Sequence, residues 1–261
     1  MKSFNFKSAN NVKEATKLSS SRSTFLAGGM TLIPALKLRL AAYSDIINIK
    51  RIKNLSGIKV SGKSVKVGSI TKHVEVSNSK EIKKTIPSLA LLAEGIGDPQ
   101  VRNRGTIGGS IANNDPAADY PSACLALNAI IHTNKKKIPA DKFFKGMFET
   151  DLKKGELIET IEFQIPEKSA YAKYPNPASR YAIVGVYIAK FKKEVRAAIT
   201  GAGSSVFRLQ ELEIALSKNF SASAIDNLNI SSKDLNSDIH ASPEYRAHMI
   251  KVMAKKAMTN I

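Results

Sequence analysis

Ala27-Gly28-Gly29-Met30-Thr31-Leu32-Ile33-Pro34 is the first of two double-glycine segments in this chain, and Arg104-Gly105-Thr106-Ile107-Gly108-Gly109-Ser110-Ile111-Ala112-Asn113-Asn114-Asp115-Pro116 is the second. Paired glycines with a hydroxyl residue after them let the backbone come close to a ligand. Outward-pointing N–H groups in such loops favour a phosphate or pyrophosphate. A single Gly-Gly pair usually marks a turn. Two such segments, with these flanking residues, predict one elongated anionic cofactor held from two sides.

The residues around the first segment predict a strand, a glycine loop and a helix start. Phe25-Leu26-Ala27 is typical of a buried strand, and Thr31 is a suitable N-cap for the helix that follows. Pro34 falls in the first turn, where its missing N–H costs little. An anion would bind at this helix start, near Thr31. The apolar side of the helix is expected to carry Leu32, Ile33, Leu36 and Leu40.

Strands and helices are also predicted around the second segment. Ser61-Gly62-Lys63-Ser64 joins two apolar runs of period two, which indicates a hairpin. A helix is expected over Pro87–Glu94, and Asp119-Tyr120-Pro121 begins another in an Ala/Leu-rich run. Ser242-Pro243-Glu244 is a third helix start. Further strands are expected at 130–132, 157–163, 182–189 and 195–199.

The composition is that of a globular protein. Of the 261 residues, 43% are hydrophobic and 24% charged, which excludes a disordered chain. No run approaches the ~18 consecutive apolar residues of a membrane span, and the N-terminus lacks the apolar core of a secretory signal. A cytoplasmic location is the default expectation. Cys124 is the single cysteine, so an iron–sulfur cluster would need ligands from elsewhere, and its apolar neighbours predict a buried thiol.

The net charge of +18 raises nucleic-acid binding as an alternative function. Lysine supplies 31 of the 40 basic residues, although the planar fork of arginine is better suited to phosphate and base recognition. The lysines are scattered singly or in short groups such as Lys135-Lys136-Lys137, without interleaved aromatic residues. A solvated basic surface is therefore the favoured interpretation, with no nucleic acid as partner.

Four further segments carry, together with the glycine loops, a resemblance to a known family. They are Leu36-Lys37-Leu38-Arg39, Ile138-Pro139-Ala140-Asp141-Lys142-Phe143-Phe144, Tyr181-Ala182-Ile183-Val184-Gly185-Val186 and Glu244-Tyr245-Arg246-Ala247-His248. Over nearly its whole length the chain resembles the FAD-binding medium subunit of the carbon-monoxide dehydrogenase and xanthine dehydrogenase group of molybdenum hydroxylases. The resemblance implies an α+β fold of the vanillyl-alcohol-oxidase (PCMH) type. Two α/β subdomains, 1–55 and 56–167, would enclose the cofactor, and 168–261 would form a small C-terminal α+β domain.

The resemblance also implies which residues bind FAD, with the two loops around its pyrophosphate and ribityl parts. Asp119 matches an aspartate that bonds ribityl or ribose hydroxyls, although the residues alone allow a helix cap equally well. Lys173 and Tyr181 match a lysine and a tyrosine near the isoalloxazine, where residues alone would indicate a surface lysine and a core tyrosine. The implied cofactor-binding residues are Ala27, Gly28, Gly29, Met30, Thr31, Ile96, Thr106, Ile107, Gly108, Gly109, Ser110, Asp119, Ile158, Lys173 and Tyr181.

Met30 and the positions of the histidines bear on how FAD would be held. Met30 stands where relatives usually carry a polar residue, so contact there is expected through backbone or apolar atoms. Covalent flavin attachment needs a suitably placed His or Cys, and all four histidines lie outside both loops, so non-covalent FAD is expected. The histidines, which show no metal-ligand spacing, are His73, His132, His240 and His248.

By the same resemblance, this chain is an electron-transfer subunit and carries no catalytic residue for the substrate. Molybdopterin would reside on a large subunit and two [2Fe–2S] clusters on a small one, with FAD here passing electrons to a quinone, NAD or another acceptor. A dimer of heterotrimers is the expected assembly. The alternative is a stand-alone FAD-dependent oxidoreductase of the same superfamily, which would need its own substrate pocket with a proton donor and anchoring arginines.

Overall fold

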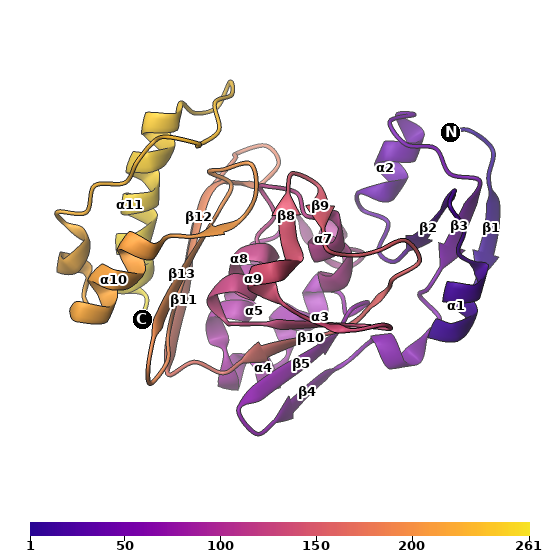
Figure 1. Ribbon diagram of the computed structural model, residues 1–261, viewed down its shortest axis with the longest axis horizontal. Coiled ribbons are helices and arrows are strands. Elements are labelled where there is room, and N and C mark those ends of the chain that lie inside the picture. The colour runs from indigo at the N-terminus through magenta and orange to yellow at the C-terminus, as the bar shows by residue number, and fades with distance from the viewer.

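The computed structural model describes residues 1–261 and arranges them as three lobes in a row (Figure 1). The elements of the N-terminal lobe are β1 (Asn5–Ser8), α1 (Val12–Leu18), β2 (Ser23–Leu26), α2 (Leu32–Lys37), β3 (Asp45–Asn48) and the 3-10 helix η1 (Lys53–Leu55). Its three strands form a parallel sheet of order β1-β3-β2. Helices α1 and α2 make the crossovers that parallel strands require. The first glycine loop therefore leaves the carboxyl end of β2.

The central lobe is built on an antiparallel sheet of five strands. In sheet order these are β4 (Ile58–Ser61), β5 (Ser64–Gly68), β10 (Ile158–Gln164), β6 (Ile130–Thr133) and β7 (Lys137–Pro139). Between β5 and β6 the chain forms α3 (His73–Asn78), α4 (Lys80–Thr85), α5 (Pro87–Glu94), α6 (Pro99–Arg102), α7 (Ile107–Asn113) and α8 (Tyr120–Ala126). Helix α9 (Ala140–Phe143) and the ribbon β8 (Phe144–Gly146)–β9 (Glu149–Thr150) follow. The second glycine loop opens α7.

The C-terminal lobe is a second antiparallel sheet covered on both faces. Its strands are β11 (Lys168–Pro175), β12 (Ala182–Lys190), β13 (Val195–Thr200) and β14 (Phe207–Arg208), and its helices are α10 (Gln210–Lys218), η2 (Ala222–Ile225) and α11 (Pro243–Thr259). Tyr187 and Ala189 of β12 join the core of the central lobe, where α8 packs on the sheet. Val186 and Ile188 face α11 instead. Because successive side chains of a strand point to opposite faces, β12 contributes to the cores of both lobes.

Most of the predicted elements are confirmed, and the differences have local causes. The hairpin, the helix Pro87–Glu94 and the Ser242 cap are present as expected. Helix α2 ends earlier than predicted, and Leu40 is 79% exposed instead of packing on its apolar side. Arg39 adopts a left-handed backbone (φ 60°), and the N–H of Leu40 donates to the carbonyl of Ala35, a pattern that terminates helices. Thr31 makes no side-chain capping bond, contrary to prediction.

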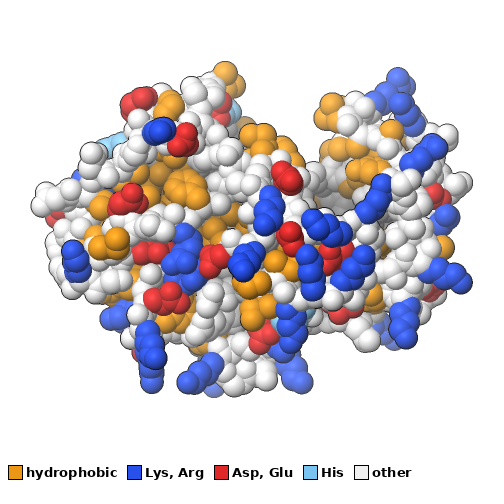
Figure 2. All heavy atoms as spheres, in the orientation of Figure 1, with side chains coloured by type: hydrophobic (Ala, Val, Ile, Leu, Met, Phe, Trp, Pro, Cys, Tyr) orange, Lys and Arg blue, Asp and Glu red, His pale blue; other side chains and the backbone are white.

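The cores of the three lobes differ greatly in size. The largest buried cluster, in the central lobe, has 30 residues and includes Cys124, as predicted for that thiol. The cluster centred on the N-terminal lobe has seven residues, one of which, Leu157, comes from the central lobe next to β10. Such a small core rarely supports independent folding, so the N-terminal lobe depends on its contact with the rest of the chain. None of the helices has the length and apolar character to cross a membrane. Lysine and arginine side chains are spread over the surface (Figure 2).

Candidate functional site

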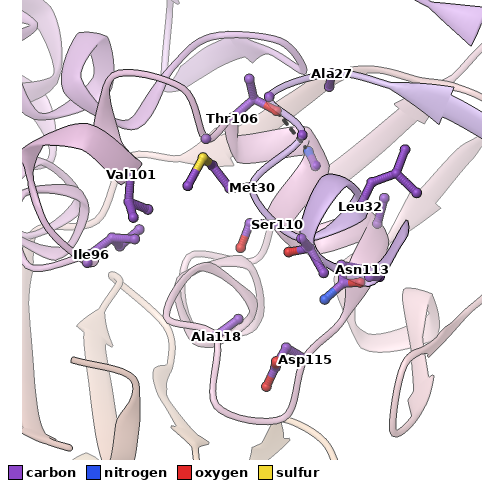
Figure 3. A pocket seen from close by; sticks show the side chains of 18 of the residues that line it. Ala27, Met30, Leu32, Ile96, Val101, Thr106, Ser110, Asn113, Asp115 and Ala118 are labelled. Atoms are coloured by element: carbon purple, nitrogen blue, oxygen red, sulfur yellow. Dashed lines mark hydrogen bonds between the residues drawn. The ribbon is translucent and has the colours of Figure 1, made fainter. Parts of the chain in front are cut away.

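A cavity of about 980 Å³ lies between the N-terminal and central lobes. Figure 2 shows the surface hollowed at this junction, and Figure 3 shows the lining from close by. The volume is at the upper end of the range for small-molecule and cofactor pockets. Both glycine loops contribute to its wall. Of the sequence-predicted residues, Ala27, Gly28, Gly29, Met30, Thr31, Ile96, Thr106, Gly109, Ser110, Asp119 and Tyr181 line it.

The first glycine loop presents a row of free backbone donors. None of the N–H groups from Gly28 to Leu32 donates a hydrogen bond to the protein, and helix bonding begins with the N–H of Ile33, which donates to the carbonyl of Gly29 at 3.0 Å. Five consecutive unpartnered amides at the wall of a cavity form a concave set of positive partial charges. The predicted anion-binding character of this loop therefore has a geometric basis, although no Thr31 cap contributes to it.

The glycines of the first loop are required by the protein itself. A Cβ placed on Gly28 would lie 2.2 Å from the carbonyl oxygen of Arg104 and 2.9 Å from the Cα of Gly105. The two loops thus touch through their backbones at this point. Gly29 has φ +81°, and its Cβ would meet the side chain of Ile33 at 2.7 Å. Neither glycine is needed merely to make room for a ligand in the cavity.

The second glycine loop differs from its predicted role because most of its amides are already used. The N–H of Ile107 donates to the carbonyl of Thr71 at 3.1 Å, and that of Gly108 donates to the carbonyl of Ser69 at 2.8 Å. Ile107 and Gly108 do not line the cavity, and a Cβ on Gly108 would strike the backbone of Ser69. The loop instead faces the cavity with Gly109 and with the hydroxyl residues Thr106 and Ser110. Its glycines serve close packing against the segment after β5.

Asp119 is a buried carboxylate with two protein partners. Its Oδ1 accepts a hydrogen bond from the Tyr171 hydroxyl at 2.5 Å and lies 2.9 Å from Lys173 Nζ. Burial raises the pKa of Asp119, against the opposing effect of the Lys173 charge. Oδ2 makes no hydrogen bond to the protein and is available to a ligand. Since Asp119 makes no capping bond to α8, the helix-cap interpretation is wrong.

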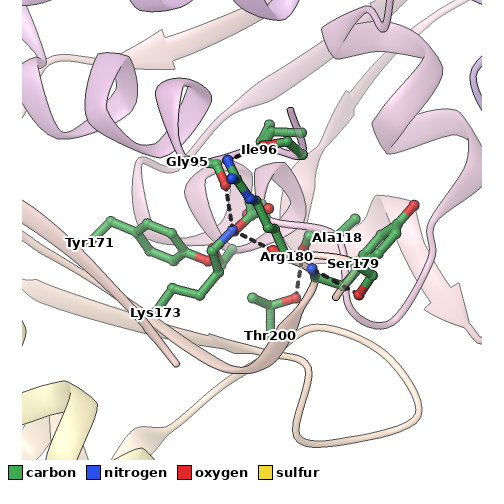
Figure 4. A network of polar contacts seen from close by, with 12 residues as sticks. Gly95, Ile96, Ala118, Tyr171, Lys173, Ser179, Arg180 and Thr200 are labelled. Carbon is green, nitrogen blue, oxygen red and sulfur yellow. Dashed lines mark hydrogen bonds and ion pairs between the residues drawn. The ribbon is translucent and has the colours of Figure 1, made fainter. Parts of the chain in front are cut away.

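Lys173 is not the surface lysine that its residue type suggested. Its side chain is 10% exposed, and besides pairing with Asp119 it donates to the carbonyls of Gly95 and Arg180, both at 2.9 Å. Figure 4 shows this network. Lys173 does not itself line the cavity. It acts on the site through Asp119 and through the loop that carries Ile96.

The loop after α5 is fixed by further cationic side chains. Arg102 Nη1 donates to the carbonyls of Ile96 and Gly97, both at 3.0 Å, and Arg180 Nη1 donates to that of Gly97 at 3.2 Å. Together with Lys173, these contacts hold Ile96 at the cavity wall, where the sequence resemblance had placed an apolar contact. In Figure 3 Ile96 and Val101 lie next to each other on one side of the cavity.

The remaining predicted residues have contrasting positions. Met30 is 38% exposed and lines the cavity, in keeping with an apolar contact. Tyr181 is 44% exposed at the cavity, so the core interpretation of this residue is wrong. Ile158 is buried in β10 within the core of the central lobe and is not among the cavity residues.

Several residues that line the cavity were missed from the sequence. His73 is 5% exposed, beneath the second glycine loop, although it lies far from that loop in the chain. Asp115 lines the cavity and accepts a hydrogen bond from the N–H of Ala117 on Oδ1 at 2.9 Å, and burial raises its pKa. Phe148 holds a left-handed backbone (φ 56°) with its ring 58% exposed. Asp115 lies within the second double-glycine segment, five residues after Ser110, which was a usable signal. The other two positions depend on long-range packing.

The fold and the site define a mixed α+β protein with a cofactor-sized cavity between two lobes. A family model described as the FAD binding domain in molybdopterin dehydrogenase matches residues 2–167. The chain belongs to this family, as a FAD-binding oxidoreductase subunit of molybdenum enzymes related to carbon monoxide dehydrogenase.

The relatives align with this chain over most of their own length. The glyceraldehyde dehydrogenase medium chain of Sulfolobus acidocaldarius is 34% identical over 99% of this chain and 98% of its own. The nicotine 6-hydroxylase medium subunit of Paenarthrobacter nicotinovorans is 29% identical over 90% of this chain and 88% of its own. A solved structure of carbon monoxide dehydrogenase from Hydrogenophaga pseudoflava, in a form lacking the Mo-pyranopterin moiety, contains a similar chain. That chain superimposes with a TM-score of 0.88 at 31% sequence identity, and the match covers 99% of this chain and 96% of the other.

Proposed function

We propose that this chain holds FAD without a covalent bond and is the electron outlet of a molybdenum hydroxylase assembly. Electrons reach it from [2Fe–2S] clusters of a small partner subunit and leave to an external acceptor, a quinone or NAD. Substrate oxidation takes place on a large subunit that carries molybdopterin. The observation that carries the proposal is the row of unpartnered amides from Gly28 to Leu32 on a cavity that the second glycine loop also lines.

The residues present fit FAD along the length of the cavity. The free amides of the first loop bind the diphosphate, since backbone N–H groups in such a row attract anions. The hydroxyls of Thr106 and Ser110 and the free Oδ2 of Asp119 bond the ribityl and ribose hydroxyls. FAD supplies the electron chemistry, because a flavin takes up single electrons and releases one or two.

The ring end of the cofactor is assigned to the wall formed by Ile96, Met30 and Tyr181. Ile96 and Met30 offer apolar contact, and the Tyr181 ring offers a flat face for stacking. Lys173 keeps Asp119 in place at 2.9 Å and opposes the rise of its pKa that burial causes, while it also fixes the loop that carries Ile96. The role of this chain is thus to orient the cofactor and exclude water from one side of it.

The role as a middle subunit is supported by cysteine content and by the relatives. Cys124, the single cysteine, is fully buried, and burial raises its pKa above the ordinary range of a thiol. Cluster ligands therefore come from a partner chain. Relatives that match over nearly their whole length are named as medium chains or subunits. We extend this to a dimer of heterotrimers.

The substrate is selected on another subunit in this proposal. The relatives named for glyceraldehyde and for nicotine differ in the molecule oxidised, yet both are similar to this chain over 90% or more of its length. A FAD chain that is largely independent of the substrate agrees with a division of labour among subunits.

Acid precipitation of the purified full-length chain is expected to release all of its yellow colour into the supernatant. Cys124 is fully buried and does not line the cavity, and His73, which does, is 5% exposed beneath the second glycine loop. Absorbance spectra of supernatant and pellet give the measurement. Colour retained by the pellet would refute non-covalent binding, and a chain that purifies without flavin even beside its partners would remove the proposed function.

A further inference from the structure

Three buried polar atoms without a hydrogen-bond partner gather behind the second glycine loop. They are Ser69 Oγ, His73 Nδ1 and Tyr120 OH, half of the six such side-chain atoms in the protein. An unsatisfied buried polar atom is costly, so native proteins pair nearly all of them with protein or with ordered water. Three unpartnered polar atoms so close together indicate that a ligand or a buried water bonds to them.

Ser69 and His73 contact the backbone of the second glycine loop, and Tyr120 packs on the His73 ring. The N–H of Gly108 donates to the carbonyl of Ser69 at 2.8 Å, and the N–H of His73 donates to the carbonyl of Gly105 at 3.0 Å. The rings of His73 and Tyr120 have centroids 5.3 Å apart. The cluster therefore lies directly beneath the loop that lines the cavity.

The two ring nitrogens of His73 have different surroundings. Nδ1 is fully enclosed, whereas Nε2 makes no hydrogen bond to the protein and is not enclosed. His73 is also one of the residues that line the cavity. A Cβ placed on Gly105 would lie 2.5 Å from Nε2, and the Cα of Gly105 would lie 2.9 Å from a Cβ placed on Gly28. Nε2 is thus adjacent to the point where the two glycine loops meet.

The state of the His73 ring follows from its surroundings. Burial and the nearby Arg102 charge lower its pKa to about 4, so the imidazole is neutral at neutral pH and carries one proton. The Tyr120 hydroxyl, whose pKa burial raises well above the usual value, remains a donor. Nδ1 of the neighbouring His73 ring also lacks a partner, and a buried water between Nδ1, the Tyr120 hydroxyl and Ser69 Oγ would have three polar partners. With Nδ1 accepting, the proton resides on Nε2.

We propose that His73 is a cofactor-binding residue whose Nε2–H donates a hydrogen bond to the diphosphate of FAD where the two glycine loops meet. Tyr120, Ser69 and one buried water hold the ring in the tautomer that this requires. The inference rests on the proposed function, since it needs FAD in the cavity. His73 would thus give the site an uncharged hydrogen-bond donor that belongs to neither glycine loop.

The test compares FAD binding by the full-length wild-type chain with two variants. His73→Phe keeps a ring against Tyr120 and Gly105 but removes both nitrogens, and we expect its dissociation constant for FAD to rise about 10- to 100-fold. The dissociation constant for ADP, which retains the diphosphate, is expected to rise by the same factor. The melting temperature of the cofactor-free variant should stay close to that of the wild type, because the phenyl ring keeps the packing against Tyr120 and Gly105. His73→Gln, which keeps a donor, should recover most of the affinity.

A second measurement addresses the tautomer. The ¹⁵N shifts of the His73 ring at neutral pH should show a neutral imidazole protonated at Nε2, and Tyr120→Phe should shift the ring toward the other tautomer. Wild-type affinity in His73→Phe, or an Nδ1-protonated ring in the wild type, would overturn the inference. Equal losses in both variants with a lower melting temperature would assign a purely structural role to His73. A wild-type chain that binds no FAD would instead remove the proposed function.

Discussion

Gly28→Ala is expected to purify without flavin and to lose about 3 kcal/mol or more of its free energy of unfolding, at the upper end of the range for overpacking. The added Cβ would lie 2.2 Å from the Arg104 carbonyl oxygen and 2.9 Å from the Cα of Gly105. Both obstacles are backbone, so no rotamer change relieves the clash. The two glycine loops must separate, and the N-terminal lobe has only a small core to hold it in place without that contact.

Gly146→Ala is the matched control for this variant. The nearest atom to its Cβ is a Glu149 carboxylate oxygen at 3.6 Å, an ordinary contact at the end of a side chain. Flavin content and chemical denaturation are measured on both variants. A loss in Gly28→Ala alone is due to the lost contact between the two loops, whereas a loss in both variants is a general effect of replacing glycine by alanine. Wild-type flavin content in Gly28→Ala would show that the two loops need not touch for the cofactor to bind.

Asp119→Ala is expected to lower the free energy of unfolding by about 3–5 kcal/mol, the range for removing one partner of a buried ion pair. The variant leaves Lys173, with a side chain only 10% exposed, without its carboxylate at 2.9 Å. The affinity for FAD should also weaken, by about 1.5–3 kcal/mol, if Oδ2 bonds the cofactor. A helix cap alone would cost about 1 kcal/mol and leave the affinity unchanged.

Two further variants separate the structural and cofactor effects of Asp119. In Asp119→Leu with Lys173→Met the buried charge is gone, and most of the stability should return, as happens when buried pairs are replaced by apolar residues. The affinity for FAD should stay low in that double variant. Asp226→Ala, which removes an exposed ion pair with Lys255, should change stability by less than about 1 kcal/mol. An unchanged FAD dissociation constant in Asp119→Ala would remove this carboxylate from the cofactor site.

The first glycine loop could be predicted because its geometry is local. Gly28 to Leu32 leave a strand and enter a helix, so their amides are free for reasons contained in about ten residues. Met30, Ile96, Asp119 and Tyr181, which the family resemblance named as cofactor-binding residues, all line the cavity, and their binding of FAD stays a prediction.

The second loop could not be predicted in the same way. Its amides bind the carbonyls of Ser69 and Thr71, more than 30 residues earlier in the chain, and a sequence pattern does not report such pairing. The same holds for His73, which reaches the cavity only because α3 packs beneath this loop. Lys173 is distinguished from a surface lysine by its contacts with Asp119, Gly95 and Arg180. These contacts form only in the folded chain. The boundaries at 55 and 167 stay predictions, although each of the three main sheets lies within one of those ranges.

Reduction of the bound FAD with and without partner subunits is the most direct test of the proposed role. The flavin of this chain alone should remain oxidised when the substrate of the assembly is added, because no cluster or molybdenum centre supplies it with electrons. After addition of the iron–sulfur and molybdenum subunits, the flavin absorbance should bleach rapidly under the same conditions. Rapid reduction of the isolated chain by a small organic substrate or by NAD(P)H, with full turnover, would contradict this account and establish a stand-alone flavoenzyme.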